Sequence, residues 1–165
     1  MKQTSIGLWT GCALALAASV CHAGGAGGND LLGIESGTGK LYRISTVNAG
    51  VTLIGPTGLA NPAALEYGPN GFLYAFTSGD NANLYTLDPG TAAATLIGPL
   101  ALPFVFEGGL AFSPNGTAYA TNGDSAGNPQ LLTINLNTGA ASVVGTISGA
   151  PHDINGLAWR SDGKL

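Results

Sequence analysis

A sixteen-residue pattern occurs three times in this sequence, and this repetition limits the fold more than any other feature. It reads LYRISTVNAGVTLIGP from Leu41, LYTLDPGTAAATLIGP from Leu84 and LLTINLNTGAASVVGT from Leu131. A second pattern keeps the same frame: LEYGPNGFLYAF from Leu65, LAFSPNGTAYAT from Leu110 and LAWRSDGKL from Leu157. The sequence therefore predicts several copies of one small unit, stacked on each other.

Each copy is predicted to form four short β-strands. In the third copy the strands are LAFS (110–113), TAYAT (117–121), LLTIN (131–135) and ASVVG (141–145). The turn SPNG joins the first two, since proline fixes φ and Asn-Gly accepts positive φ. Residues 24–165 show no helical period, because their apolar segments are short and interrupted by glycine or proline.

The predicted strands carry apolar residues on both faces, as in TLIG and SVVG. A sheet of this kind needs cover on both sides, so each copy is expected to bury the faces of its neighbours. Small residues at 92–94 and 140–141 are expected to let the sheets approach closely near a central axis.

Units of the form LYxIDxxTGxAxxIGP followed by GLAFxPNGxLYA resemble those of secreted bacterial β-propeller proteins, with repeats similar in style to NHL and regucalcin-like repeats. The resemblance implies an all-β fold of four-stranded antiparallel blades. It divides the chain into a partial first blade at 30–56, blades at 65–99 and 110–146, and the start of a further blade at 156–165.

About three blades are fewer than the roughly four to eight of closed propellers. We therefore expect an incomplete propeller. Three interpretations are open: the chain is a truncated piece of a longer propeller, copies of it associate to close the ring, or its sheets stay open. We favour the first.

Residues 1–23 are predicted to be a secretory signal peptide. Lys2 precedes an apolar run at 6–20, and Cys21 and Ala23 are the small residues before an expected cleavage after Ala23. A lipoprotein interpretation of Cys21 is disfavoured by the bulky residue Val20. Both cysteines, Cys12 and Cys21, lie in this segment. We expect a secreted or periplasmic protein whose mature chain, 24–165, has no disulfide and no membrane span.

The charge of the chain excludes nucleic acid as an expected partner. The formal net charge is −4 and charged residues make up only 8% of the sequence. A phosphate backbone needs a basic surface, which this composition does not supply. The expected partner is a protein or a carbohydrate.

Two equivalent polar loops are candidate calcium sites. Asp80 and Asn83 lie in the first loop, and Asp124 and Asn128 in the second. Calcium takes oxygen ligands such as these side chains supply. The alternative is that they form turns by bonding to their own backbone. No other cofactor is expected.

Regucalcin-like lactonases, which the repeats resemble in style, hold a metal with a Glu, Asn and Asp set. Glu66, Glu107 and Asp153 are predicted near the starts of the innermost strands, with Asn61 and Asn155 nearby. The two glutamates occupy different positions in their repeats, which argues against a built metal site.

The motif GDSAG around Ser125 matches G-x-S-x-G, and His152 is the histidine of the mature chain. A nucleophile elbow needs a helix after the serine, whereas a loop and a strand are predicted here. No catalytic residue is therefore assigned.

Tyr67, Phe112 and Trp159 occupy one repeat position, and we expect them to pack between blades rather than to form a sugar platform. The sequence favours a secreted, non-enzymatic propeller segment for binding or extracellular scaffolding. The alternative is a metal-dependent propeller hydrolase or lactonase.

Overall fold

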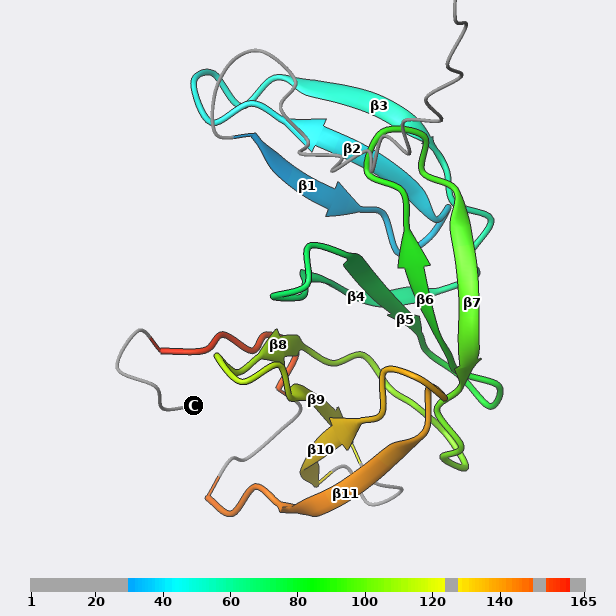
Figure 1. The fold of residues 1–165 in the computed structure, drawn as a ribbon, viewed down its shortest axis with the longest axis vertical. Coiled ribbons are helices and arrows are strands. Elements are labelled where there is room, and N and C mark those ends of the chain that lie inside the picture. The colour runs from blue at the N-terminus through cyan, green and yellow to red at the C-terminus, as the bar shows by residue number, and fades with distance from the viewer. Residues whose placement is uncertain (1–29, 124–127, 150–153, 161–165) are drawn as a thin grey trace, which may run out of the picture.

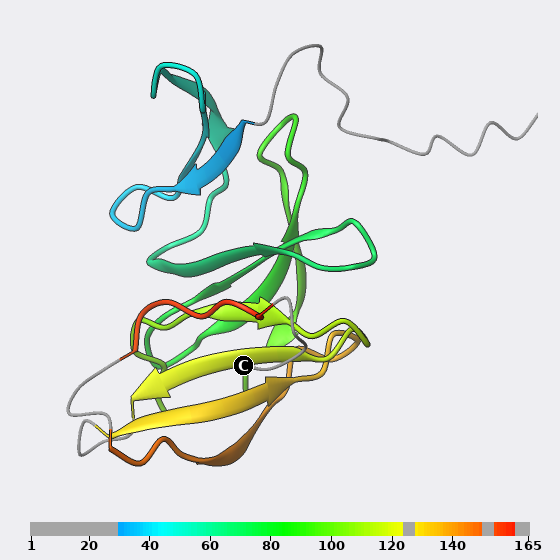
Figure 2. The same cartoon turned by 90° about the vertical axis from the view of Figure 1, so that its left-hand side faces the viewer.

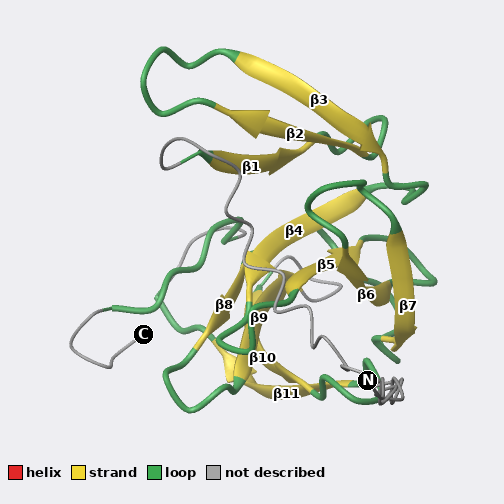
Figure 3. Ribbon diagram, turned by 45° about the horizontal axis from the view of Figure 1, so that its top comes forward, coloured by secondary structure: helices red, strands yellow, loops and turns green. Residues whose placement is uncertain are grey.

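The structure is a computed structural model, and it describes residues 30–123, 128–149 and 154–160. These residues form antiparallel strands and no helix (Figure 3), which confirms the predicted all-β class. The strands are β1 (Leu31–Ile34), β2 (Lys40–Ile44), β3 (Val51–Pro56), β4 (Pro62–Tyr67), β5 (Leu73–Thr77), β6 (Asn83–Leu87), β7 (Ala94–Pro99), β8 (Leu110–Phe112), β9 (Ala118–Gly123), β10 (Pro129–Ile134) and β11 (Ala141–Thr146).

The strands form three sheets, each a simple meander. The first sheet is β1-β2-β3, the second is β4-β5-β6-β7, and the third is β8-β9-β10-β11. The sheets fan out along an arc, with β3, β7 and β11 on its outside and β4 and β8 on its inside (Figure 1). Residues 154–160 run along the third sheet, next to β8 (Figure 2). A Cβ on Gly109 would lie 2.5 Å from the backbone N of Leu157.

The turn between the last two strands has the same structure in every sheet. These outer turns span residues 45–50, 88–93 and 135–140. In each, the backbone N–H of the fifth residue donates to the carbonyl of the first: Ala49 to Ser45 at 2.9 Å, Ala92 to Asp88 at 2.8 Å, and Gly139 to Asn135 at 2.8 Å. The fifth residue has a positive φ in all three, at 56°, 65° and 83°. The polar first residue also accepts a backbone N–H with its side chain, which is the chemistry that makes these residues turn formers.

Asp88 shows this chemistry most clearly. Its Oδ1 accepts the backbone N–H groups of Gly90 at 2.7 Å and Thr91 at 2.9 Å. These two hydrogen bonds hold the pKa of the Asp88 carboxyl below its usual value. Stability from this group is present at neutral pH and is lost as pH falls through the lowered pKa, but the side chain is exposed and the contribution is small.

The repeated leucines share one register. Leu41, Leu84 and Leu131 pair with Gly55, Gly98 and Gly145, respectively, and the ladder shifts at the next residue of the leucine strand. Such a shift is a β-bulge, which bends the outer strand. We call Gly55, Gly98 and Gly145 the bulge glycines.

The core consists of two clusters, one on each face of the second sheet. One contains Leu41, Leu73 and Ala92, and the other contains Phe76, Leu84 and Leu132. All five residues of β5 are buried. The copies therefore bury each other's faces, as the two-sided apolar strands predict.

Candidate functional site

Two hollows lie along the inner strands of the sheets and residues 154–160. The central hollow, of about 350 Å³, is lined by β1, β4, Glu107 and Asn155. The aromatic hollow, of about 270 Å³, is lined by Glu66, Tyr67, Ala111, Phe112, Ala158 and Trp159.

The aromatic hollow is built from three chain segments that hold the same place in successive repeats. Tyr67 comes from β4, Phe112 from β8 and Trp159 from 154–160. The Phe112 ring lies 5.3 Å from that of Tyr74, and the Trp159 ring 5.8 Å from that of Tyr119, both measured between centroids. These two side chains are packed, as the repeat position predicts. Tyr67 is 42% exposed, so its ring is accessible to solvent.

Polar groups accompany the rings. Glu66 is half-buried, and this burial raises the pKa of its carboxyl, while a hydrogen bond from the Tyr67 N–H at 3.1 Å acts in the opposite direction. The indole N–H of Trp159 is buried and has no hydrogen-bond partner among the described residues. The hollow therefore combines the accessible Tyr67 ring with a carboxyl acceptor.

The residues considered for a lactonase metal site are not assembled. Glu66 is the penultimate residue of β4, not near its start as expected, and it lines a different hollow from Glu107. Asn61 lies in neither hollow, and its carbonyl accepts the N–H of Ser78 at 2.9 Å. Asp153 lies outside the described residues. The described part of the chain holds no group of three or more His, Cys, Asp or Glu residues that could bind a metal. Glu66 and Glu107 therefore do not belong to one donor set in the described residues.

The serine motif falls largely outside the described residues, since Ser125 and His152 both lie there. Strand β10 begins at Pro129, only four residues after Ser125, so a strand follows where an elbow needs a helix.

The first predicted calcium loop is pinned by backbone contacts. Gly79 and Val105 exchange two hydrogen bonds, of 2.7 and 3.1 Å. Asn83 is half-buried, and its side-chain amide donates to the carbonyl of Asn81 at 2.6 Å, whereas Asp80 is exposed. In the second loop Asp124 lies outside the described residues, and Asn128 is exposed immediately before β10. Calcium binding at these loops stays a prediction.

Calcium binding is expected to raise the melting temperature of the chain 24–165, because a ligand that binds only the folded state stabilises it. The measurement is thermal unfolding with calcium and with chelator, for the wild type and for the double variant Asp80→Ala/Asp124→Ala. The double variant is expected to have the same melting temperature with calcium as with chelator. Equal melting temperatures for the wild type under these two conditions would reject calcium binding.

Two buried polar residues of β9 hold neighbouring segments in place, and no pattern in the sequence predicted their contacts. The Thr121 hydroxyl accepts the Gly109 N–H at 2.8 Å and donates to the Ile154 carbonyl at 2.6 Å, which ties 154–160 to the third sheet. Asn122 accepts the Phe106 N–H at 2.8 Å with its side-chain oxygen. A difference between the repeats could have pointed to Thr121. This threonine occupies the repeat position at which the second sheet has the buried Phe76.

No known family model matches this sequence, and no curated protein matches it. Solved structures do match. A chain of a nidogen/laminin complex has a TM-score of 0.56 and 16% identity, over 79% of this chain and 48% of that one. A protein of unknown function from Bacteroides thetaiotaomicron has a TM-score of 0.51 and 20% identity, over 83% and 35%. TolB from Acinetobacter baumannii has a TM-score of 0.50 and 19% identity, over 81% and 32%.

The fold is that of an incomplete β-propeller. This confirms the predicted fold class, and each sheet of the structure is a blade of the propeller type. The chain spans between about a third and a half of the propeller structures that it matches. In the described residues, no helix is long and apolar enough to cross a membrane.

Proposed function

We propose that this protein is exported and acts as a non-catalytic propeller module that binds a partner at the aromatic hollow. The observation that carries the proposal is the convergence of Tyr67, Phe112 and Trp159 from three successive repeats beside the half-buried Glu66. The predicted signal peptide at 1–23 supports export.

The chemistry of the hollow favours a carbohydrate. The exposed Tyr67 ring offers a flat apolar face, and the Glu66 carboxyl offers an acceptor for hydroxyl groups. A volume of about 270 Å³ lies near the lower end of binding pockets, about 300–1,000 Å³, so it suits a single ring of a larger ligand. A protein partner is the other predicted class, and the nidogen/laminin structure shows a protein of this fold in a protein complex.

The proposal is tested by the fluorescence of Trp159. Trp9 lies in the predicted signal peptide, so Trp159 is the only tryptophan expected in the chain 24–165. Titration with neutral oligosaccharides, such as tetramers of glucose, xylose and N-acetylglucosamine, is expected to give a saturable change with at least one of them.

Tyr67→Ala is expected to abolish this change. Phe72→Ala is the matched control, because Phe72 is also an exposed aromatic residue, at 59%, but lies outside the hollow. No saturable change with any probe, or the same response from Tyr67→Ala as from the wild type, would reject the hollow as a carbohydrate site.

A metal-dependent hydrolase or lactonase is the second candidate, since Glu107 and Asn155 line one hollow together. It is tested by lactone hydrolysis in the presence of calcium, zinc or manganese ions. We expect no turnover above that of Glu107→Gln. Metal-dependent turnover that Glu107→Gln removes would replace the binding proposal with an enzymatic one.

A further inference from the structure

Successive sheets meet through one repeated junction, in which an outer turn covers a bulge glycine. The turn 88–93 of the second sheet covers Gly55 of the first, where an added Cβ would lie 3.0 Å from the carbonyl oxygen of Thr91 and 3.4 Å from the Cβ of Ala92. The turn 135–140 of the third sheet covers Gly98 of the second, where an added Cβ would lie 3.1 Å from the carbonyl carbon of Thr138. Each junction thus has a turn half and a glycine half.

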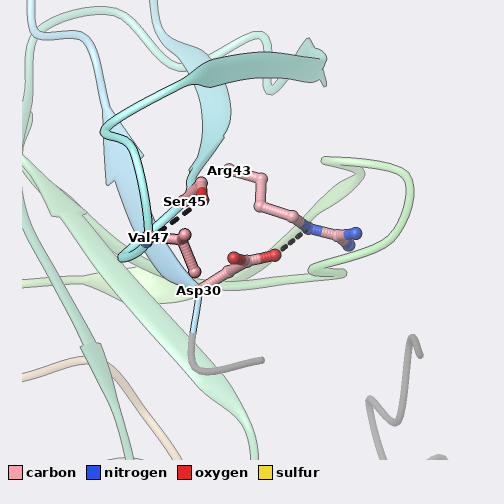
Figure 4. A network of polar contacts seen from close by, with 4 residues as sticks. All are labelled: Asp30, Arg43, Ser45 and Val47. Carbon is pink, nitrogen blue, oxygen red and sulfur yellow. Dashed lines mark hydrogen bonds and ion pairs between the residues drawn. The ribbon is translucent and has the colours of Figure 1, made fainter. Parts of the chain in front are cut away.

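The first sheet has a turn half that covers no glycine in the part of the chain that the structure describes. Its outer turn 45–50 has the hydrogen bond and the positive φ of the other two. Ala92 and Gly139 are buried in their junctions, whereas the equivalent Ala49 is exposed. Val47, at the tip, is 89% exposed. Figure 4 shows this turn, with the Val47 N–H directed at the Ser45 hydroxyl, next to the ion pair of Asp30 and Arg43.

The third sheet has a glycine half that no described segment covers. No described residue comes within 4 Å of an added Cβ on Gly145. Val144, beside it, is 58% exposed, although the equivalent Ile54 and Ile97 are half-buried. Leu131, the pairing partner of Gly145, is only half-buried, whereas its counterparts in the first two sheets are fully buried.

We propose that copies of this chain associate head to tail, with the turn 45–50 of one copy packed on Gly145 of the next. The turn 45–50 and the Gly145 face are complementary, because the equivalent turns and bulge glycines already pack on each other at two junctions inside the chain. An apolar outer face of a repeat unit is normally covered by a neighbouring unit, and the face with Leu131 and Val144 is apolar. The contact joins two different surfaces, so it is heterologous and forms a ring if the rotation closes.

The inner strands fit the same arrangement. Among the described residues the first sheet has no counterpart of β4, so β1 is its inner edge there. Residues 154–160 lie where the next inner strand belongs, beside β8. Head-to-tail packing would bring this segment of one copy to the β1 edge of another, where unpaired backbone groups accept an added strand. A closed pair would contain six sheets, twice the three described, within the roughly four to eight of closed propellers.

The experiment measures the mass of the chain 24–165 in solution by sedimentation equilibrium over a range of concentrations. The wild type is expected to exceed the mass of one copy as concentration rises. Gly145→Leu is expected to stay at one copy, because the added side chain has room in the single copy but fills the place of the incoming turn. Gly37→Leu is the matched control, since Gly37 is exposed in open space on another turn and should leave association unchanged.

A mixing experiment tests the head-to-tail geometry itself. Ala49→Leu enlarges the turn half and is expected to block association by itself. A mixture of Ala49→Leu with Gly145→Leu retains one intact turn half and one intact glycine half, so it is expected to recover the mass of two copies and no more.

Three results would overturn the proposal: a wild type of one-copy mass at every concentration, association of Gly145→Leu equal to that of the wild type, or no recovery on mixing. If the wild type has the mass of one copy, the turn 45–50 and the Gly145 face would instead be covered by further repeats of a longer protein. The oligosaccharide titration, carried out on Gly145→Leu, decides the proposed function separately.

Discussion

Leu84→Ala is expected to lower the free energy of unfolding by about 2–5 kcal/mol, as for other fully buried leucines. Leu84 is 0% exposed and lies between the second and third sheets, where its removal leaves a cavity that two sheets must close. The measurement is urea unfolding at low protein concentration, followed by circular dichroism.

Leu131→Ala is the matched variant, and it is expected to cost roughly half as much or less. Leu131 has the same repeat position and the same glycine partner as Leu84, but it is half-buried because no described sheet follows. The comparison separates the effect of neighbouring sheets from that of the strand itself. Equal losses from the two variants would mean that inter-sheet packing does not set the burial of this position.

Gly98→Ala is expected to lower the free energy of unfolding by about 3 kcal/mol or more, at the upper end of overpacking effects. The added Cβ would overlap the carbonyl group of Thr138, which belongs to the backbone of a tight turn and cannot rotate away as a side chain can. The φ of Gly98 is not positive, so the loss would come from the close approach of two sheets and not from backbone strain.

Gly145→Ala is its control, with an expected change within about 0.5 kcal/mol, because Gly145 has the same place in the repeat but faces open space. Both variants are compared by urea unfolding under the conditions used for the leucines. A tolerated Gly98→Ala would show that the sheets can move apart at this junction without loss, and the junction would then not fix their spacing.

The repeat carried most of the information on the fold. Leu41, Leu84 and Leu131 fixed a common frame, and the turn residues between the strands made the expected hairpins. The expectation that small residues let the sheets approach closely near the axis was wrong about the place. The close approach involving Ala92 occurs at the outer turns and not near the axis, because the bulge glycines that it requires lie on the outer strands.

The candidate site was harder to predict, because it depends on positions where the copies differ. The threonine at 121 replaces a buried phenylalanine, and it contacts Ile154, 33 residues away in the sequence. A repeated pattern reports what the copies share, so it does not reveal such a contact. It also identified Tyr67 as equivalent to Phe112 without showing that only Tyr67 is largely exposed. The calcium loops remain a prediction, since Asp124 lies outside the described residues.

The meander order of the strands has a consequence for how the chain acquires its structure. Each of the strands β1 to β11 pairs only with strands next to it in the sequence among the described residues, so each hairpin closes a short loop at little entropic cost. If the polypeptide emerges from one end first, as during export across a membrane, its early strands do not have to stay unpaired until much later strands emerge. Each hairpin can pair as soon as its own residues emerge, and each sheet is then covered when the next one follows.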